Sequence, residues 1–132
     1  MIVDTSALVA ILFGEPEAAE FASLIASSSV CRISVVNRLE LTIVLGQQTK
    51  PDASRQADAF LRAAGIVEEP VTLLQGELAR QAYYDFGRGR HPAKLNFGDC
   101  FAYALAKAMD EPLLYKGQDF VKTDIRPVRR SN

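Results

Sequence analysis

Residues 1–10 read MIVDTSALVA, and this stretch decides how the rest of the chain is interpreted. The apolar residues before Asp4 indicate a short buried strand, and the apolar run from Ser6 to Phe13 indicates a helix directly after it. One explanation of Asp4 is helix capping, because Asp, Thr and Ser side chains accept hydrogen bonds from the free N–H groups at a helix start. The other explanation is a functional carboxylate, which similarly placed carboxylates elsewhere in the chain would favour.

The composition is that of an ordinary globular protein. The 132 residues are 48% apolar and 23% charged, so we expect a single domain over residues 1–132 with a hydrophobic core. The 15 basic and 16 acidic residues nearly cancel, so a phosphate-binding surface must come from local clustering of charge. Two cysteines and one histidine do not make a structural zinc site. No leader or membrane-spanning apolar run is recognisable, and the expected location is cytoplasmic, without membrane contact.

Short apolar strands alternate with helices along the chain. Further strands are predicted within residues 30–33, 66–73 and 112–115, with a short edge strand at 126–128. Helices are predicted from Pro16 to Ser28, over residues 35–48, up to Ala64, over residues 76–87 and from Asn96 onward. This alternation predicts an α/β fold with a mostly parallel sheet.

Glu40 is the least expected carboxylate. It lies on or beside the apolar stripe of the helix predicted over residues 35–48. An ionised carboxylate in such a place needs a proton, a metal or a cationic partner such as Arg38. Structural and functional explanations of Glu40 are therefore both open.

Asp99 and Asp119 also have structural explanations when each is considered alone. Asp99 follows Asn96 by three residues, which is the spacing of a helix capping box. Asp119 follows the strand at 112–115 within ordinary turn chemistry.

Considered together, the four acids favour a shared site. Asp4 and Asp119 follow strands, and Glu40 and Asp99 lie in the first halves of apolar helices. The carboxyl ends of parallel strands meet at one edge of a sheet, where binding sites form at the topological switch point. Carboxylates without enough His or Cys for zinc indicate Mg²⁺, with Mn²⁺ as a substitute.

Four segments resemble, in order and spacing, the PIN domain and specifically the VapC-type toxin ribonucleases of bacterial toxin–antitoxin pairs. They are MIVDTSALVA, VVNRLELTIVL, GRGRHPAKLNFGDCFAYALA and PLLYKGQDFVKTDI. The resemblance covers nearly the whole chain. It implies a PIN-like three-layer α/β/α fold with a central, mostly parallel sheet of four to five strands.

The resemblance also implies roles for individual residues. The catalytic acids are Asp4, Glu40, Asp99 and Asp119, with Asp4 and Asp99 as the direct metal ligands. Ser6 matches a hydroxyl that orients the acids, and Thr5 and Ser6 are left to cap the helix. Gln118 stands where related sequences often have Asn or Asp, so whether Asp119 is a metal ligand stays open.

The implied function is Mg²⁺-dependent hydrolysis of RNA phosphodiester bonds, because metal ions held by carboxylates activate water and neutralise phosphate charge. Whether one or two ions act, and which RNA is cut, stay open. Phosphate contacts are expected from Ser6, Arg88, Arg90, His91, Lys94 and Lys116. The alternatives are a phosphotransfer enzyme, which lacks its second acid at Ser6, and a non-catalytic PIN-fold module that binds RNA or protein.

The resemblance further implies a cognate VapB-type antitoxin that inhibits the toxin, and a homodimer. The early helices ALVAILF (7–13) and AAEFASLI (18–25) carry apolar surface that would offer a groove to an antitoxin helix. The alternative is that both helices pack into the core.

Overall fold

Four short parallel strands form the centre of the molecule, in a computed structural model that describes residues 1–47, 50 and 52–129. The strands are β1 (Ile2–Val3), β2 (Arg32–Ser34), β3 (Val67–Glu69) and β4 (Leu113–Leu114). Their order in the sheet is β3-β2-β1-β4, which confirms the predicted parallel sheet. The edge strand predicted at 126–128 is reduced to one isolated bridge between Leu113 and Pro127, because proline has no N–H to extend a ladder.

The helices that connect the strands are α1 (Thr5–Leu12), α2 (Ala18–Ser27), α3 (Val35–Gly46), α4 (Ala53–Ala63), α5 (Leu73–Phe86) and α6 (Phe97–Met109). A short 3-10 turn, η1 (Phe120–Lys122), follows β4. Helix α5 begins three residues before the predicted start, because the Thr72 hydroxyl caps it by accepting a hydrogen bond from the Gln75 N–H at 3.1 Å. The predicted end of the third helix at Gln48 lies outside the described residues. None of the described helices has the length and apolar character needed to cross a membrane.

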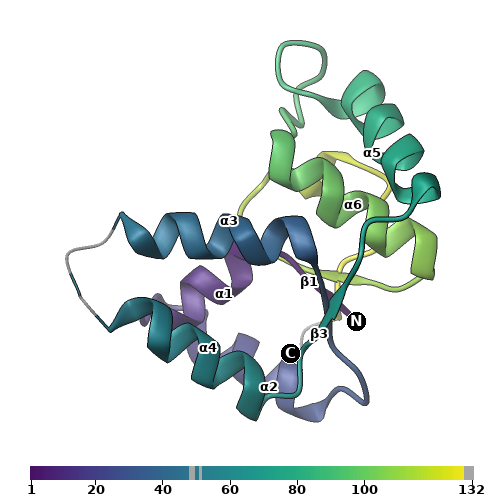
Figure 1. Cartoon of the computed structure of the whole chain (residues 1–132). Coiled ribbons are helices and arrows are strands. Elements are labelled where there is room, and N and C mark those ends of the chain that lie inside the picture. The colour runs from purple at the N-terminus through teal and green to yellow at the C-terminus, as the bar shows by residue number, and fades with distance from the viewer. Residues whose placement is uncertain (48–49, 51, 130–132) are drawn as a thin grey trace.

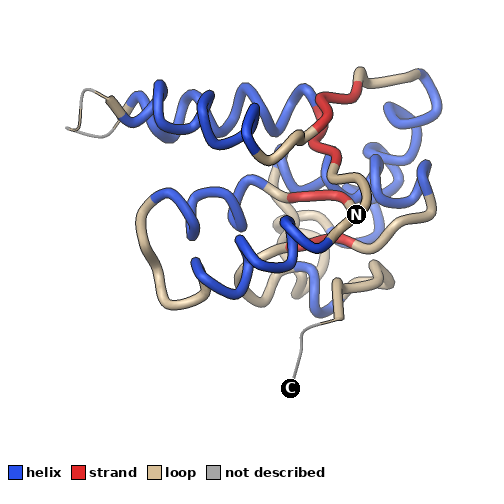
Figure 2. Tube along the Cα trace, turned by 90° about the horizontal axis from the view of Figure 1, so that it is seen from below, coloured by secondary structure: helices blue, strands red, loops and turns tan. Residues whose placement is uncertain are grey.

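Helices cover both faces of the sheet and produce three layers (Figures 1 and 2). Successive residues of a strand point to opposite faces. Ile2 accordingly packs with residues of α5 and α6, whereas Val3 packs with residues of α1 to α4. The three-layer arrangement implied by the resemblance is therefore confirmed.

The central position of β1 creates the topological switch point. The chain leaves β1 for β2 on one side and returns to β4 on the other side only at its end. The Asp4 N–H donates to the Leu114 carbonyl at 2.9 Å, which fixes the end of β1 beside the end of β4. Ligand sites of open parallel sheets form at such a point.

Candidate active site

A cleft of about 400 Å³ opens at the switch point, and all four predicted acids line it: Asp4, Glu40, Asp99 and Asp119. They come from four separate parts of the chain. Asp4 follows β1, Glu40 lies on α3, Asp99 lies in the first turn of α6, and Asp119 directly precedes η1. The fold thus brings together side chains that are more than a hundred residues apart in the sequence.

Asp4 both caps α1 and faces the cleft. Its Oδ2 accepts hydrogen bonds from the Ser6 N–H at 3.0 Å and from the Ser6 hydroxyl at 2.5 Å. The Ser6 hydroxyl in turn accepts from the Lys116 N–H at 3.0 Å, so Ser6 joins the ends of β1 and β4. The expectation that Thr5 and Ser6 cap the helix is wrong, because Asp4 is itself the cap and the Thr5 hydroxyl donates to the Asn37 carbonyl.

Asn37 holds Glu40 by a hydrogen bond, and the cationic partner considered for Glu40, Arg38, pairs with Asp58 instead. The fully buried Asn37 amide donates to Glu40 Oε1 at 3.3 Å and to the Gly98 carbonyl at 3.0 Å. A side chain at Gly98 would collide with the Glu40 carboxylate. The glycine therefore leaves the space that Glu40 occupies beneath α6.

Asp99 completes a capping box at the start of α6 and lines the cleft as well. The Asp99 N–H donates to the Asn96 side chain at 2.9 Å, and Asp99 Oδ2 accepts from the Asn96 N–H at 3.1 Å. The capping explanation is thus correct for Asp99, and it does not exclude the functional one. A single carboxylate has further lone pairs that face away from the cap.

The acids of the cleft repel one another. Burial is the main reason that the pKa of Asp4 is raised to about 6. The hydrogen bonds from Ser6 lower this pKa, and the charge of Glu40 raises it. Burial also raises the pKa of Asp99 to about 7, with added repulsion from Asp4, Asp119 and Glu40. Such mutual repulsion is the electrostatic condition that a bound cation relieves.

The donor set of the cleft fits a hard divalent cation. Carboxylate oxygens are the protein ligands that Mg²⁺ and Mn²⁺ prefer. Within the described residues, however, no three Asp, Glu, His or Cys side chains are already gathered tightly enough to hold a metal ion. The raised pKa values of Asp4 and Asp99 show that their negative charge is unfavourable in the cleft, and a bound cation would compensate this charge.

Lys116 lines the cleft, but carboxylates of the α1–α2 connection already hold its ammonium group. It pairs with Glu15, and with Glu17 at 2.9 Å. These contacts, the Glu15 hydrogen bond above all, raise the pKa of Lys116. The lysine is therefore at the predicted place, with its charge compensated by two acids that the sequence did not single out.

Ser6 lines the cleft as well, but the four predicted phosphate-binding residues of the basic loop do not. Arg88, Arg90, His91 and Lys94 surround a separate hollow of about 600 Å³ in the loop between α5 and α6. His91 has a structural role there, because its Nδ1 accepts the Ala93 N–H at 3.0 Å and its ring meets Phe86 edge-on at 5.2 Å.

Asn37 and Gly98 are the site residues that the sequence did not reveal. A signal for Asn37 exists in the sequence: it is a polar residue one turn before Glu40 on an apolar helix. No comparable signal exists for Gly98, because its role depends on a tertiary contact with another helix.

The comparisons with known proteins show the family of the chain. The PIN domain family model matches residues 1–126. The chain belongs to the PIN domain family. Ribonuclease VapC28 of Mycobacterium tuberculosis is 53% identical over 127 residues, covering 96% of each sequence, which places this PIN domain among the VapC ribonucleases.

Solved structures share the fold of this PIN domain. The crystal structure of Mycobacterium tuberculosis VapC20, described as a sarcin–ricin loop cleaving toxin, superposes with a TM-score of 0.75 at 23% identity, covering 97% of this chain and 98% of the other. A toxin–antitoxin complex from Klebsiella pneumoniae superposes with a TM-score of 0.68 at 18% identity, covering 93% and 92%.

Proposed function

We propose that this PIN domain is a Mg²⁺-dependent endoribonuclease of the VapC toxin type. The observation that carries the proposal is the cleft at the switch point, where four acids from distant segments converge. Burial there, with repulsion from neighbouring carboxylates, raises the pKa of Asp4 to about 6 and that of Asp99 to about 7. The membership of the chain in the VapC ribonucleases supports RNA as the substrate.

The residues of the cleft have different proposed roles. Asp4 and Asp99 are the proposed metal ligands, and Glu40 and Asp119 complete the negative wall of the cleft. Ser6 fixes the Asp4 carboxylate rather than contacting RNA directly, since its hydroxyl is engaged with Asp4 and the Lys116 N–H. When bound, Mg²⁺ supplies an activated water and neutralises charge on the scissile phosphate.

Cleavage of RNA in Mg²⁺ and in EDTA tests this function. Wild-type protein is expected to cut RNA only with the cation and to leave 5′-phosphate and 3′-hydroxyl ends. Asp99→Asn keeps nearly the same shape and a capping side chain, so it is expected to fold and not to cut. If RNA cleavage is unchanged by EDTA and by Asp99→Asn, the nuclease proposal is wrong. RNA binding without cleavage by the wild type would favour the non-catalytic module.

The proposed inhibitor is a VapB-type antitoxin, as the resemblance implies, and the similarity to a toxin–antitoxin complex supports it at the level of fold. Within the groove expected on residues 7–13 and 18–25, Leu8, Phe21 and Ile25 are buried in the core, whereas Phe13 is 41% exposed. Co-expression with the adjacent small reading frame is expected to give a stable complex without ribonuclease activity. A freely active ribonuclease under these conditions would contradict the proposal.

A homodimer is also proposed, and helix α3 offers a surface for it. Val35, Leu39 and Ile43 recur every four residues and are 43%, 60% and 53% exposed, so they form an apolar stripe on one face. Leu39→Glu is expected to convert a dimer into a monomer in sedimentation velocity. An unchanged sedimentation coefficient would place the interface elsewhere.

A further inference from the structure

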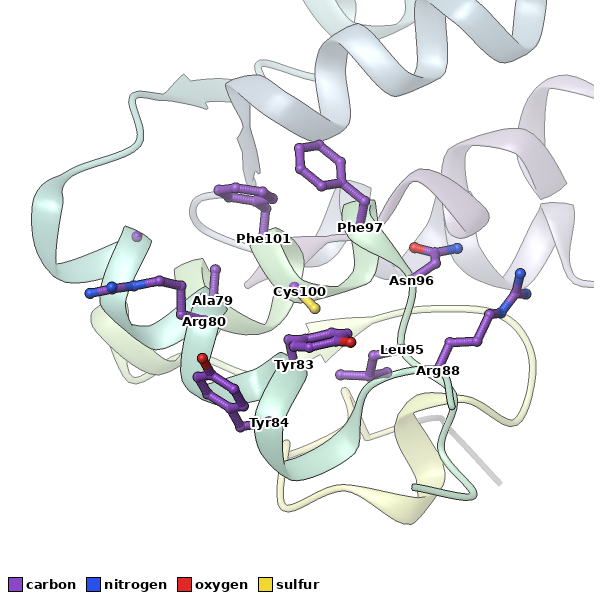
Figure 3. A pocket seen from close by; sticks show the side chains of 11 residues that line it. Ala79, Arg80, Tyr83, Tyr84, Arg88, Leu95, Asn96, Phe97, Cys100 and Phe101 are labelled. Carbon is purple, nitrogen blue, oxygen red and sulfur yellow. The ribbon is translucent and has the colours of Figure 1, made fainter. Parts of the chain in front are cut away.

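A third hollow, of about 580 Å³, lies between α5 and α6 and has mainly apolar walls. Its floor and sides come from Ala79, Tyr83, Leu95, Phe97, Cys100 and Phe101. Figure 3 shows Tyr83 between Arg80 and Arg88, with the Phe97 and Phe101 rings projecting from α6. We call this hollow the aromatic groove.

The aromatic groove exposes an unusual amount of ring surface. Tyr83, Tyr84 and Phe97 are 45%, 59% and 75% exposed. Phe97 and Phe101 meet at 5.1 Å between ring centroids, and Tyr83 and Tyr84 meet at 5.9 Å. Large exposed apolar surfaces of this kind mark binding sites.

Arginine side chains surround the same rings. Arg80 and Arg88 line the groove, and the Arg90 guanidinium lies 5.5 Å from the Tyr83 centroid and 5.2 Å from the Tyr84 centroid. Within the part of the chain that the structure describes, none of these three arginines forms an ion pair with a carboxylate. Exposed rings combined with free cations match a ligand that has a flat face and negative charge.

The aromatic groove connects the two sites already described. Asn96 lines both the groove and the acid cleft, and Arg88 lines both the groove and the hollow of the basic loop. One strand of nucleic acid that enters the acid cleft therefore meets the groove next and the basic loop after it.

We propose that the aromatic groove binds an unpaired nucleobase of the RNA strand, adjacent to the phosphate held in the acid cleft. This inference rests on the proposed ribonuclease function. Proteins recognise single-stranded RNA by stacking splayed bases on aromatic side chains and on arginine guanidinium planes, while cations contact the backbone. Paired bases do not expose their faces in this way, so the groove selects unpaired segments of the substrate.

Abasic scanning tests the nucleobase site. A fluorescein-labelled single-stranded RNA of about eight nucleotides and a series with one base at a time replaced by an abasic ribose are titrated in EDTA, with anisotropy as the readout. Since stacking contributes about 1–3 kcal/mol per base, removing the bound base is expected to weaken wild-type binding about tenfold. The other abasic positions should have little effect.

The variants locate the effect in the groove. Tyr83→Ala is expected to bind intact RNA about tenfold more weakly and to lose the sensitivity to the abasic position, whereas Tyr83→Phe keeps both. Phe97→Ala serves as the second truncation, because its ring is mostly exposed and its loss leaves the core intact. Arg88→Ala should lower the dependence of log Kd on log salt by about one phosphate contact. Arg55→Ala is the matched control on α4, at the opposite end of the molecule from α5 (Figure 1), and should change nothing.

Three results would overturn the nucleobase site. The first is that no abasic position weakens RNA binding by the wild type. The second is that Tyr83→Ala weakens binding of the intact and of every abasic RNA equally. The third is that Tyr83→Ala converts a dimer to a monomer while its sensitivity to the abasic position is unchanged. The last result would assign the groove to a second copy of the chain. RNA cleavage by the wild type in Mg²⁺ is measured in parallel. If the protein cleaves RNA but its binding does not depend on any abasic position, only the nucleobase site is refuted. If binding depends on an abasic position but RNA is not cleaved, only the ribonuclease function is refuted.

Discussion

Asp4 and Asp99 each have two roles, one in a helix cap and one in the acid cleft. An aspartate at a helix start ordinarily stabilises the fold, because the helix N-terminus favours negative charge. In the cleft, burial and repulsion work in the opposite direction and raise the pKa values of both carboxyls. The hydrogen bonds of the caps fix the positions of both side chains. The cleft destabilises their ionised forms when no cation is bound.

The raised pKa of Asp99 predicts that the stability of the folded protein depends on pH. Its pKa rises from an ordinary 3.8 to about 7 in the folded protein, so the folded state holds a proton that the unfolded state releases. The stabilisation linked to this proton is complete below about pH 4 and is lost as the pH rises through about 7. In EDTA, Asp99→Asn is therefore expected to gain stability relative to wild type between pH 4.5 and 8, by about 1–2 kcal/mol after solvent screening.

Urea denaturation of both proteins at pH 4.5, 6 and 8 checks this prediction. The difference in the free energy of unfolding between variant and wild type isolates Asp99 from the other titrating groups. A difference that stays constant across this range would show that Asp99 does not titrate as the cleft requires.

At the scale of elements, the contact between α3 and α6 sets the position of Glu40. The Asn37 amide bridges the two helices through Glu40 and the Gly98 carbonyl, and Gly98 leaves room for the carboxylate. Glu40 of α3 and Asp99 of α6 both line the cleft. The packing of α3 against α6 thus determines the shape of the acid cleft.

Gly98→Ala is expected to separate activity from stability. The three heavy atoms nearest to the added Cβ all belong to the end of the flexible Glu40 side chain, and alanine gains about 0.5–1 kcal/mol over glycine within a helix. The free energy of unfolding should therefore change by at most about 1 kcal/mol. Displacement of Glu40 should lower RNA cleavage by about a hundredfold, as misplaced catalytic groups commonly do. Thermal melts and cleavage rates measure the two effects.

Gly46→Ala is the matched control for Gly98→Ala, because a Cβ there meets open space at the end of α3. It should leave cleavage unchanged. Full activity of Gly98→Ala, or a melting temperature that collapses with it, would show that the glycine does not serve the position of Glu40.

At the scale of the whole molecule, the sequence predicted the parallel sheet and all four acids of the cleft. The alternation of short apolar strands with helices is a local signal. The acids were recognisable as a set, because two follow strands, two lie early in apolar helices, and all four lie in segments that resemble the PIN domain. The placement of the basic loop was not predictable in the same way. Its cations form a hollow beyond the aromatic groove, and that separation depends on how α5 packs against α6.

The early helices illustrate the same limit. Their apolar residues were compatible with either a partner groove or the core, and the structure buries Leu8, Phe21 and Ile25 in the core but leaves Phe13 41% exposed. Which face a helix turns toward the sheet is settled by tertiary packing, and an apolar helix does not encode it on its own. The most exposed apolar side chains lie on α3, on α5 and at the start of α6, where Leu39, Leu73 and Phe97 are 60%, 92% and 75% exposed.

Binding of Mn²⁺, followed by the electron paramagnetic resonance signal of the free ion, tests the acid cleft most directly. Wild-type protein at neutral pH is expected to bind the ion, and Asp4→Asn and Asp99→Asn should each weaken binding at least about tenfold, since each removes a charged oxygen ligand. Asp85→Asn, an exposed acid of α5 outside the cleft, should bind as wild type does. No binding by the wild type, or equal binding by wild type and Asp99→Asn, would contradict the assignment of this cleft as a metal-dependent active site.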